Sequence, residues 1–325
     1  MTDPVRHGLS PAVATVVVGS RGLLGRAVVR AVHEARDLAL LAAPSVPWDD
    51  DDAAATALGE AAELLAGHDG PWQLLWCAGA GVNGMTRQAA DRDVAQFESF
   101  VRALAARSPA SPGSVFLASS AGGVYAGSAD EAPYDEDSAV GALSEYGATK
   151  LRLEAVLGLL DGTDGVSSLV GRFANLYGPG QDLGKQQGLV SHLCLGALER
   201  RPVSIFVPLD TLRDYVFVSD AAEKALASLD ALRRSGRRSA VKVIGSGAAT
   251  TVASVLGDVA AAAGTRPPVI LGASPLSAMQ SHDLRLRSAV FPEVDLLPVT
   301  PFPAGIAATW ADLFARFVAR GRRPS

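Results

Sequence analysis

The sequence predicts an α/β fold in which a doubly wound parallel sheet is followed by a smaller mixed α/β lobe. Two observations predict this fold. Uniformly apolar strand segments alternate with segments of helical periodicity over residues 1–175, and such alternation is typical of parallel strands joined by right-handed helical crossovers. In addition, a glycine-rich turn directly follows the first strand and opens the first helix, as in a Rossmann-type sheet.

The first half of the chain supplies strands and helices in a regular order. The β-branched run 13–18 predicts a strand, and the apolar spacing over 23–35 predicts a helix. The elements expected next are a strand over 38–41, a helix over 56–66, a strand over 72–78, a helix over 96–106, a strand over 114–118, a helix over 145–160 and a strand over 167–172. These elements complete the predicted sheet and its helical layers.

The regular alternation ends after residue 175, where the segment 177–180, Tyr-Gly-Pro-Gly, predicts a turn and a polar loop follows. The elements expected beyond it are a helix over 189–199, a short strand over 203–207, a helix from Ser219, a strand over 241–244 and further helices. This part of the chain therefore predicts the smaller lobe.

Composition and charge exclude several classes of function. The chain has 325 residues, of which 48% are hydrophobic, and a net charge of -5, so it can form a sizeable core but offers no basic face for nucleic acid. No segment approaches the ~18 uninterrupted apolar residues of a membrane span. Cys77 and Cys194 lack disulfide or metal-ligand spacing, and the histidines are scattered. We expect a cytoplasmic protein without metal, nucleic-acid or membrane partners.

The strongest motif is Gly19-Ser20-Arg21-Gly22-Leu23-Leu24-Gly25, which joins the first strand to the first helix. Its glycines allow a tight turn, a close approach of the backbone to a pyrophosphate and close packing of helix against strand. The N–H groups at the start of the helix attract the phosphate charge. All residues of the motif are therefore expected to bind a dinucleotide cofactor.

The end of the second strand indicates which cofactor is bound. An NAD site commonly offers a carboxylate to the ribose 2′-hydroxyl about 20 residues beyond the glycine motif. Here residues 40–45 contain no carboxylate, and the next one is Asp49. The guanidinium of Arg21 can instead pair with a 2′-phosphate. The sequence thus favours NADP(H), while NAD(H) stays possible if Arg21 is only a solvated turn residue.

A Tyr-x-x-x-Lys pattern, Tyr146 and Lys150, lies at the start of the predicted helix 145–160. Residues four apart project from the same helix face. A neighbouring ammonium favours the phenolate form of a phenol, which suits proton exchange near neutral pH. Tyr146 and Lys150 are therefore the expected catalytic pair, and both are also expected to contact the cofactor.

Together these motifs resemble the extended short-chain dehydrogenase/reductase superfamily, and in particular its NAD(P)-dependent sugar-nucleotide epimerases, dehydratases and reductases. The segments 172–179, R-x-x-N-x-Y-G-P, and 213–220, R-D-Y-x-x-V-x-D, add to the resemblance. It implies that Tyr146 exchanges a proton with the substrate and that Lys150 also holds the nicotinamide ribose. It further implies that Ala78, Gly79 and Ala80, at the exit of the third strand, pack against the cofactor.

The serine that such enzymes place beside the tyrosine is less clear in this chain. Family members reading Ser-Ser-Ser-Ala-Thr-Val-Tyr-Gly use the third residue, whereas Ala121 stands there in this sequence. We expect Ser120 to take the role and Ser119 to be the second choice, because the adjacent Gly122-Gly123 pair can redirect the backbone. Tyr125 is a further candidate donor to the substrate.

The resemblance also implies a nucleotide-diphosphate sugar as substrate. Asn175 would contact the sugar nucleotide, Gly188 and Leu189 would lie beside the base, and Arg213 would pair with the diphosphate, unless it forms a structural ion pair with Asp214 or Asp220. The corresponding domains are a cofactor-binding domain over 1–175 with returning segments at about 210–245, and a substrate-binding lobe over 176–209 and 246–325.

Three functions are compatible with these motifs. The favoured one is the NADP(H)-dependent reduction of the C4 keto group of a nucleotide-linked sugar, with Tyr146 as general acid. The alternatives are an NAD-dependent nucleotide-sugar 4-epimerase and a non-catalytic cofactor-binding regulator. Dehydration is disfavoured because Ala121 and Gly122 stand where acid/base groups are expected. The family resemblance also implies a homodimer built on helices 96–106 and 151–160.

Overall fold

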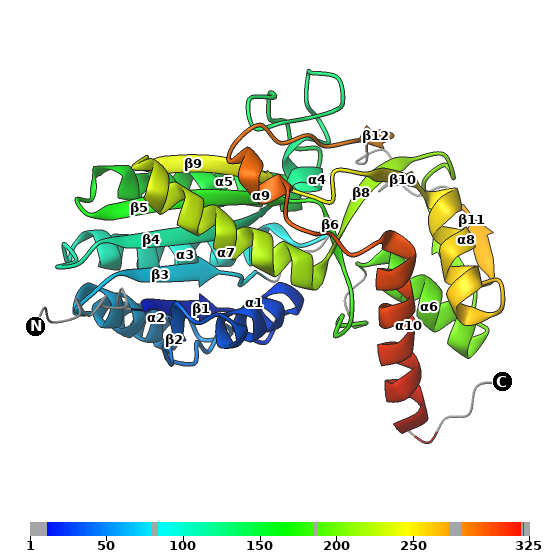
Figure 1. Ribbon diagram of the computed structural model, residues 1–325, viewed down its shortest axis with the longest axis horizontal. Coiled ribbons are helices and arrows are strands. Elements are labelled where there is room, and N and C mark those ends of the chain that lie inside the picture. Colours follow the sequence, from blue (N-terminus) through cyan, green and yellow to red (C-terminus); the bar gives the residue numbers. More distant parts are fainter. Residues whose placement is uncertain (1–11, 80–83, 185–186, 273–280, 320, 322–325) are drawn as a thin grey trace, which may run out of the picture.

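The computed structural model describes residues 12–79, 84–184, 187–272, 281–319 and 321. A six-stranded parallel sheet forms the larger domain, and its strand order is β2-β1-β3-β4-β5-β9 (Figure 1). In that order the strands are Leu38–Leu40, Val13–Val18, Trp72–Trp76, Gly113–Ser120, Val166–Phe173 and Ser239–Ile244. The predicted Rossmann-type α/β fold is therefore confirmed.

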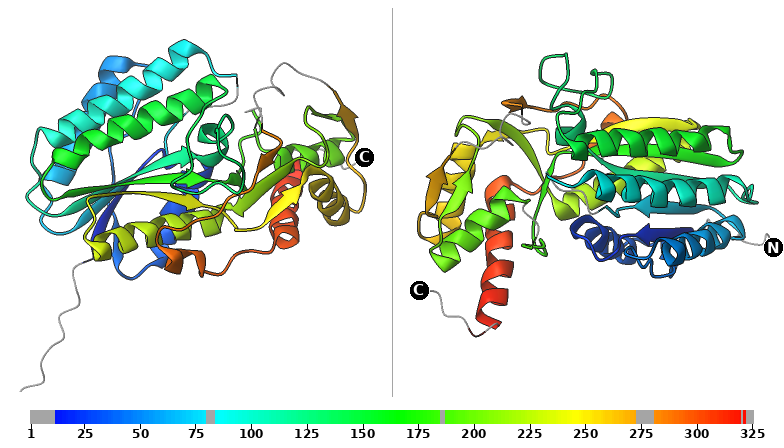
Figure 2. Two further views of the ribbon diagram at one scale, coloured as in Figure 1. Left: turned by 90° about the horizontal axis from the view of Figure 1, so that it is seen from above. Right: turned by 180° about the vertical axis from the view of Figure 1, so that it is seen from behind.

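Helices cover both faces of this sheet. Helices α1 (Leu23–Glu34) and α7 (Val218–Ser235) pack together on one face. Helices α2 (Asp51–Ala66), α3 (Arg87–Ala105) and α5 (Glu145–Leu157) cover the other, where α3 and α5 lie side by side (Figure 2). A short helix α4 (Ala121–Val124) follows β4, and a 3-10 turn η1 (Gly158–Gly162) follows α5. The layers place the carboxyl ends of all the parallel strands at one edge.

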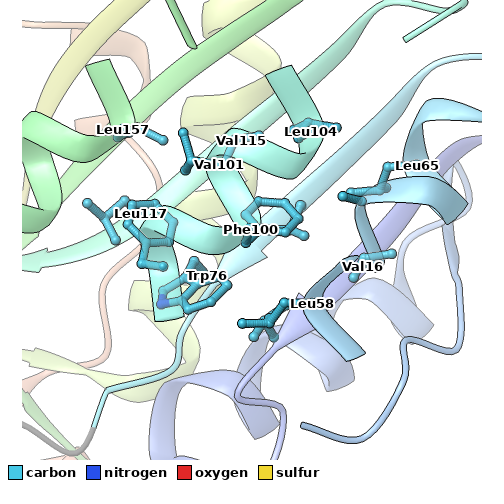
Figure 3. Close-up of a cluster of buried hydrophobic side chains, with 14 of the residues drawn as sticks. Val16, Leu58, Leu65, Trp76, Phe100, Val101, Leu104, Val115, Leu117 and Leu157 are labelled. Carbon is cyan, nitrogen blue, oxygen red and sulfur yellow. The ribbon is translucent and has the colours of Figure 1, made fainter. Parts of the chain in front are cut away.

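The core between the sheet and α2, α3 and α5 is apolar and densely packed (Figure 3). The Trp76 ring lies 4.7 Å from the Phe97 ring and 5.6 Å from the Phe100 ring, measured between centroids. Trp72, Phe97 and Phe100 are fully buried, so each contributes a large hydrophobic area to folding. This core fixes β3 and β4, whose ends carry candidate site residues.

Two helices begin earlier than their apolar spacing predicts. Helix α2 begins at Asp51 instead of residue 56, because the Asp50 side chain accepts a hydrogen bond from the Ala53 N–H. Helix α3 begins at Arg87 instead of residue 96, and Thr86 caps it through the Ala89 N–H. In the undetected segments 51–55 and 87–95, most side chains are polar or alanine, and only Ala54, Ala90 and Val94 are buried. Hydrophobic periodicity is therefore weak there, whereas the N-capping side chains mark the starts of the helices.

The smaller lobe contains short strands packed on three helices. One sheet joins β10 (Ala249–Thr251), β8 (Leu212–Phe217), β12 (Asp283–Leu284) and β6 (Asn175–Tyr177), and a second pairs β11 (Val269–Leu271) with β7 (Val203–Ile205). The helices are α6 (Leu189–Glu199), α8 (Val252–Ala263) and α10 (Phe302–Ala319), which share one hydrophobic core. In the described ranges, no helix has the length and apolar content needed to cross a membrane.

The returning segments differ from the predicted domain division in two places. Strand β8 was not expected, and it joins the lobe sheet, while α7 and β9 join the main domain. Beyond β12 the chain returns to the main domain, where Phe291 and Val294, beside α9 (Pro292–Asp295), pack with α1 and α7. The fully buried Lys242 ammonium of β9 contacts Asp295 at 2.6 Å. Residues 285–297 thus pack on the main sheet domain.

Candidate active site

A continuous cavity of about 2280 Å³ follows the carboxyl edge of the main sheet and extends into the smaller lobe. The glycine turn 19–24 and residues 40–46 line its first part. Tyr146 and Lys150 line its centre, and Asn175, Arg213 and residues of α6 line its far part. Ligands of open α/β sheets bind at this edge. The structure therefore brings the separate sequence motifs together in one cavity.

The glycine turn has the backbone geometry that a bound pyrophosphate needs. Gly19 has φ +82°, and a Cβ atom there would lie 2.5 Å from the Ala78 nitrogen. Gly25, predicted to bind the cofactor, is not part of the cavity lining, and a Cβ atom there would collide with the Gly19 carbonyl oxygen. No side chain caps the N-terminus of α1 at Gly22, so its first N–H groups remain available to an anion. The turn can therefore cradle a dinucleotide.

Opposite this turn, Ala78 and Gly79 line the same cavity at the exit of β3. A Cβ atom on Gly79 would lie 3.7 Å from the Lys150 Nζ and 4.0 Å from an Asp93 carboxylate oxygen. The Lys150 and Asp93 side chains therefore border the space that is open because Gly79 has no side chain. Ala80, also expected to bind the cofactor, lies outside the described residues.

Tyr146 and Lys150 lie on the first turns of α5 and face the cavity together. The Ser144 side chain accepts a hydrogen bond from the Gly147 N–H at 3.2 Å and fixes where the helix begins. The Lys150 Nζ lies 5.8 Å from the centroid of the Tyr146 ring and donates to the Ala118 carbonyl oxygen at 2.9 Å. The bond to β4 holds the ammonium beside the phenol ring.

The two candidate serines have different partners although they are adjacent in β4. Ser120 caps α4 by accepting a hydrogen bond from the Gly123 N–H at 3.2 Å. A Cβ atom built on Gly123 would lie 3.4 Å from the Ser120 Cβ and 3.2 Å from the Tyr146 ring, so Ser120 lies close to the tyrosine. Ser119 instead donates to the Glu154 carboxylate at 2.5 Å. The geometry therefore favours Ser120 over Ser119.

A buried ion pair holds α5, the helix that carries Tyr146 and Lys150, against strand β5. Arg172 of β5 donates to both carboxylate oxygens of Glu154, at 3.2 Å and 2.7 Å, and the two side chains are 8% and 11% exposed. Glu154 lies one helical turn beyond Lys150 on α5. The pair thus ties the helix that carries Tyr146 and Lys150 to the adjacent strand. Glu154 was not predicted as a site residue, because its partner Arg172 lies on β5 and no local spacing connects the two.

The structure argues against the predicted substrate contact of Tyr125. Its side chain is fully buried. Its hydroxyl donates to the Asp135 carbonyl oxygen at 2.6 Å and accepts from Arg172 at 2.7 Å. Burial is the main cause that raises the pKa of this phenol. Because its hydroxyl already has two partners inside the protein, Tyr125 is a structural residue and not a free donor.

The residues predicted for substrate binding lie together in the far part of the cavity. Asn175, Gly188, Leu189 and Arg213 all line it. Arg213 donates to the carbonyl oxygens of Leu212, Ser281 and His282, and burial lowers the pKa of its guanidinium. The three carbonyl partners carry no formal charge, and the Asp283 carboxylate offsets only part of the guanidinium charge, so Arg213 can still attract an anion.

The alternative ion pair of Arg213 with Asp214 or Asp220 is not present among the described residues. Asp214 accepts hydrogen bonds from the N–H groups of Ser246 and Gly247, at 2.9 Å and 3.0 Å. Asp220 accepts from the Thr300 N–H at 2.6 Å. Both carboxylates therefore hold loops in place. Further cavity-lining residues that sequence analysis missed are Asp93, His192, Phe206 and Leu284.

The cysteines do not supply a thiolate nucleophile at neutral pH. Burial raises the pKa of the Cys77 thiol to about 12, with a smaller opposing effect of the Lys150 ammonium, and raises that of Cys194 to about 12. Within the described part of the chain, no group of three or more histidine, cysteine, aspartate or glutamate side chains could hold a metal ion. The chemistry of the cavity therefore centres on Tyr146 and Lys150.

We expect neither cysteine of the folded protein to react readily with iodoacetamide at pH 7.5. A shift of the thiol pKa from the ordinary value of 9.0 to about 12 lowers the thiolate fraction, and hence the alkylation rate, about 10³-fold. The rate should rise with pH up to about 12. Intact-mass analysis would follow the labelling, with urea-unfolded protein as the positive control. Rapid labelling of Cys77 at pH 7.5 would contradict its protonated state.

Comparison with known proteins identifies relatives in sequence and in fold. The family model described as "NAD dependent epimerase/dehydratase family" matches residues 15–244. The crystal structure of the UDP-glucose 4-epimerase of Thermus thermophilus in complex with NAD superimposes with a TM-score of 0.76, at 21% identity, and covers 93% of this chain and 99% of that chain. At this identity, the structural likeness shows the shared fold.

Two curated relatives align over shorter segments. The putative UDP-glucose 4-epimerase of Methanocaldococcus jannaschii is 32% identical over 116 residues, which are 36% of this chain and 38% of that protein. The dTDP-4-dehydro-6-deoxyglucose reductase of Escherichia coli is 29% identical over 116 residues, 36% of this chain and 36% of that protein. The aligned segments thus span less than half the length of these relatives, which include both an epimerase and a reductase.

Proposed function

The chain belongs to the NAD dependent epimerase/dehydratase family, and from this premise we propose that it uses NADP(H) to reduce the C4 keto group of a nucleotide-linked sugar. One observation carries the proposal. Tyr146 and Lys150 face the same cavity as the glycine turn that can cradle a dinucleotide. A proton donor and a hydride source at one site are the requirements of carbonyl reduction.

The cofactor fits the described residues of the first part of the cavity. The glycine turn, where a Cβ atom would meet neighbouring backbone, leaves room for a pyrophosphate. Lys150 and Gly79 border the position expected for the nicotinamide ribose. When bound, the cofactor supplies the hydride. The protein residues orient the two reactants and manage the proton.

In the proposed reaction, the carbonyl carbon gains a hydride and the carbonyl oxygen gains a proton. Tyr146 gives its phenolic proton to that oxygen as negative charge develops there. The Lys150 ammonium, held 5.8 Å from the ring centroid, stabilises the phenolate that remains. Ser120, beside the Tyr146 ring, donates a hydrogen bond to the same oxygen. Asn175 and Arg213 hold the nucleotide part of the substrate at the far end.

The preference for NADP(H) rests on the surroundings of the ribose at the end of β2. Residues 40–46 line the cavity there and none is acidic, and the first carboxylate of the lining beyond β2 is that of Asp49. Arg21 also lines the cavity, is exposed, and forms no ion pair within the described residues. A guanidinium without a protein carboxylate partner can bind a 2′-phosphate.

We expect Arg21→Ala to raise the KM for NADPH about tenfold, the effect of losing one charge-assisted hydrogen bond, and to leave the KM for NADH unchanged. Initial rates with both cofactors would measure this. Arg36→Ala removes the same charge from an exposed residue outside the cavity lining and serves as the control. An equal rise for both cofactors would contradict the role of Arg21 in cofactor choice.

A 4-epimerase with retained NAD is the second candidate, because relatives with that activity match the chain. The purified protein can be analysed for bound cofactor and supplied with NADPH and a panel of nucleotide-linked 4-keto sugars. Oxidation of NADPH with one equivalent of reduced sugar would support the reductase. Stoichiometric bound NAD⁺ with C4 epimerisation and no net NADPH oxidation would reject the reductase in favour of the epimerase.

The proposed assembly is a homodimer built on α3 and α5. These helices lie side by side on one face of the main sheet (Figure 2), and a paired surface of this kind suits a two-fold contact with a second copy. Light scattering of the purified protein would give the mass. A monomer at micromolar concentration would reject this assembly without affecting the proposed reaction.

A further inference from the structure

We propose that Leu284 determines specificity and selects a deoxy sugar, in which the carbon next to the reacting carbonyl bears a methyl group instead of a hydroxymethyl group. The inference rests on the proposed function, to which it adds the class of sugar. Leu284 is 6% exposed and lines the cavity. Its position, its surroundings and its chemistry each support the selection.

Leu284 lies between the reaction centre and the proposed diphosphate ligand. In the parallel pairing of β12 with β8, Leu284 is the partner of Arg213. On its other side, a Cβ atom on Gly122 would lie 3.8 Å from the Leu284 Cδ1. Gly122 is followed by Gly123, which abuts the Tyr146 ring. A sugar with its diphosphate at Arg213 and its carbonyl at Tyr146 would therefore lie beside Leu284, and the inference assigns the substituent on the carbon next to the carbonyl to this side of the sugar.

The wall formed by Leu284, Gly122, Gly123 and Ala126 carries no polar side-chain atom, and all four residues line the cavity. A buried hydrophobic cluster lies behind it and contains Leu284 itself with Ala121, Val124, Tyr125, Tyr134 and Val243. The hydroxyl of Tyr125 is occupied by Asp135 and Arg172. The side chains behind the wall are thus hydrophobic, and the Tyr125 hydroxyl among them bonds to other residues, so they add no polar group to the wall.

An apolar wall discriminates between two sugars that differ by one hydroxyl. A methyl group packs against Leu284 and loses contact with water, which is favourable. A hydroxymethyl group pressed against the same wall exchanges water for a surface without a polar side chain. Apolar pockets distinguish such pairs by about 10-fold to 10²-fold in kcat/KM. We therefore expect at least about a tenfold preference for the deoxy sugar.

The test uses stable nucleotide sugars in the oxidative direction. Matched pairs of hexose and 6-deoxyhexose, linked to UDP or to dTDP, are supplied with NADP⁺ or NAD⁺. Formation of reduced cofactor and of the C4 epimer is measured, so that a reductase and an epimerase are both detected. The expected result is a kcat/KM ratio of about ten or more in favour of the 6-deoxyhexose.

Two variants assign the preference to the wall. Leu284→Asn adds an amide that can pair with the hydroxyl, and should lower the ratio about fivefold or more. Leu286→Asn makes the same change two residues away, at a side chain packed on the same cluster but outside the cavity lining, and should leave the ratio unchanged. Should Leu284→Asn not fold, Gly122→Ser places a hydroxyl on the same wall.

The outcomes separate this inference from the proposed function. Absence of turnover with every sugar and both cofactors would overturn the proposed function and this inference with it. Turnover without a preference for the deoxy sugar would overturn the inference alone. The same holds if Leu286→Asn shifts the ratio as much as Leu284→Asn, because the effect would then arise from loosened packing and not from contact with the sugar.

Discussion

Replacing Tyr146 with phenylalanine is expected to lower kcat by about 10²-fold to 10⁴-fold, the usual contribution of a positioned proton donor. The substitution removes the hydroxyl and keeps the ring, which abuts Gly123, so the fold should be unchanged and the cofactor should still bind, weakened by no more than the loss of one hydrogen bond. Steady-state rates with the active sugar would measure kcat. Fluorescence titration with NADPH would measure binding of the cofactor.

Tyr134→Phe is a matched control for this substitution. Tyr134 is 6% exposed, stacks on the Tyr125 ring and lies outside the cavity lining, so loss of its hydroxyl should leave kcat unchanged. If Tyr146→Phe turns over every active substrate as fast as the wild type, the catalytic assignment of Tyr146 is wrong. If the wild-type protein binds the cofactor but turns over none of the sugars, a non-catalytic regulator would be favoured instead.

Replacing Arg172 with methionine is expected to lower the free energy of unfolding by about 3–5 kcal/mol, because it leaves the Glu154 carboxylate buried without its charged partner. The two side chains are 8% and 11% exposed, so water can compensate only slightly. Ser119 remains as a donor to Glu154, but a hydroxyl does not replace a guanidinium. Urea unfolding followed by circular dichroism would measure the loss.

Two comparisons make this prediction specific. Arg102→Met breaks an ion pair with Glu98 whose side chains are 68% and 35% exposed, so it should cost less than about 1 kcal/mol. In the double variant Glu154→Leu, Arg172→Met, no buried charge is left unpaired, and part of the loss should be recovered. A loss below about 1 kcal/mol for Arg172→Met alone would show that the pair does not stabilise the fold.

The local motifs were sufficient to predict the residues that the structure brings together along the carboxyl edge of the main sheet. The glycine turn and the pair Tyr146 and Lys150 each fall within one turn or one helix, so sequence spacing fixes their geometry. The β-α alternation likewise determined the fold class. The family resemblance, which the family model over residues 15–244 confirms, added the expectation of a nucleotide-linked sugar.

The roles of the other hydroxyl groups could not be predicted because their partners are distant in sequence. Ser119 and Ser120 are neighbours, yet Ser119 bonds to Glu154, 35 residues away. The Tyr125 hydroxyl accepts from Arg172, 47 residues away. No local pattern distinguishes a hydroxyl that faces a cavity from one that faces a buried ion pair. Only tertiary packing decides which of them is available to a substrate.

Strand β8 was missed for a related reason. It carries Arg213 and Asp214, which are 8% and 1% exposed, and buried charged residues contradict the apolar pattern by which strands are recognised. Their partners come from residues 281–282 and 246–247. Hydrophobic periodicity therefore cannot predict a strand whose buried residues are charged, and such a strand is recognised only from the fold.

The return of residues 285–297 to the main sheet domain has a consequence for engineering this protein. Phe291 and Val294 complete the layer between α1 and α7, and Asp295 neutralises the buried Lys242. A chimera that exchanged everything beyond β9 for the corresponding part of a relative would therefore replace part of the interior of the main sheet domain. A graft of the smaller lobe from a relative should therefore keep residues 285–297 of this protein and replace only lobe segments before residue 285 and after residue 297.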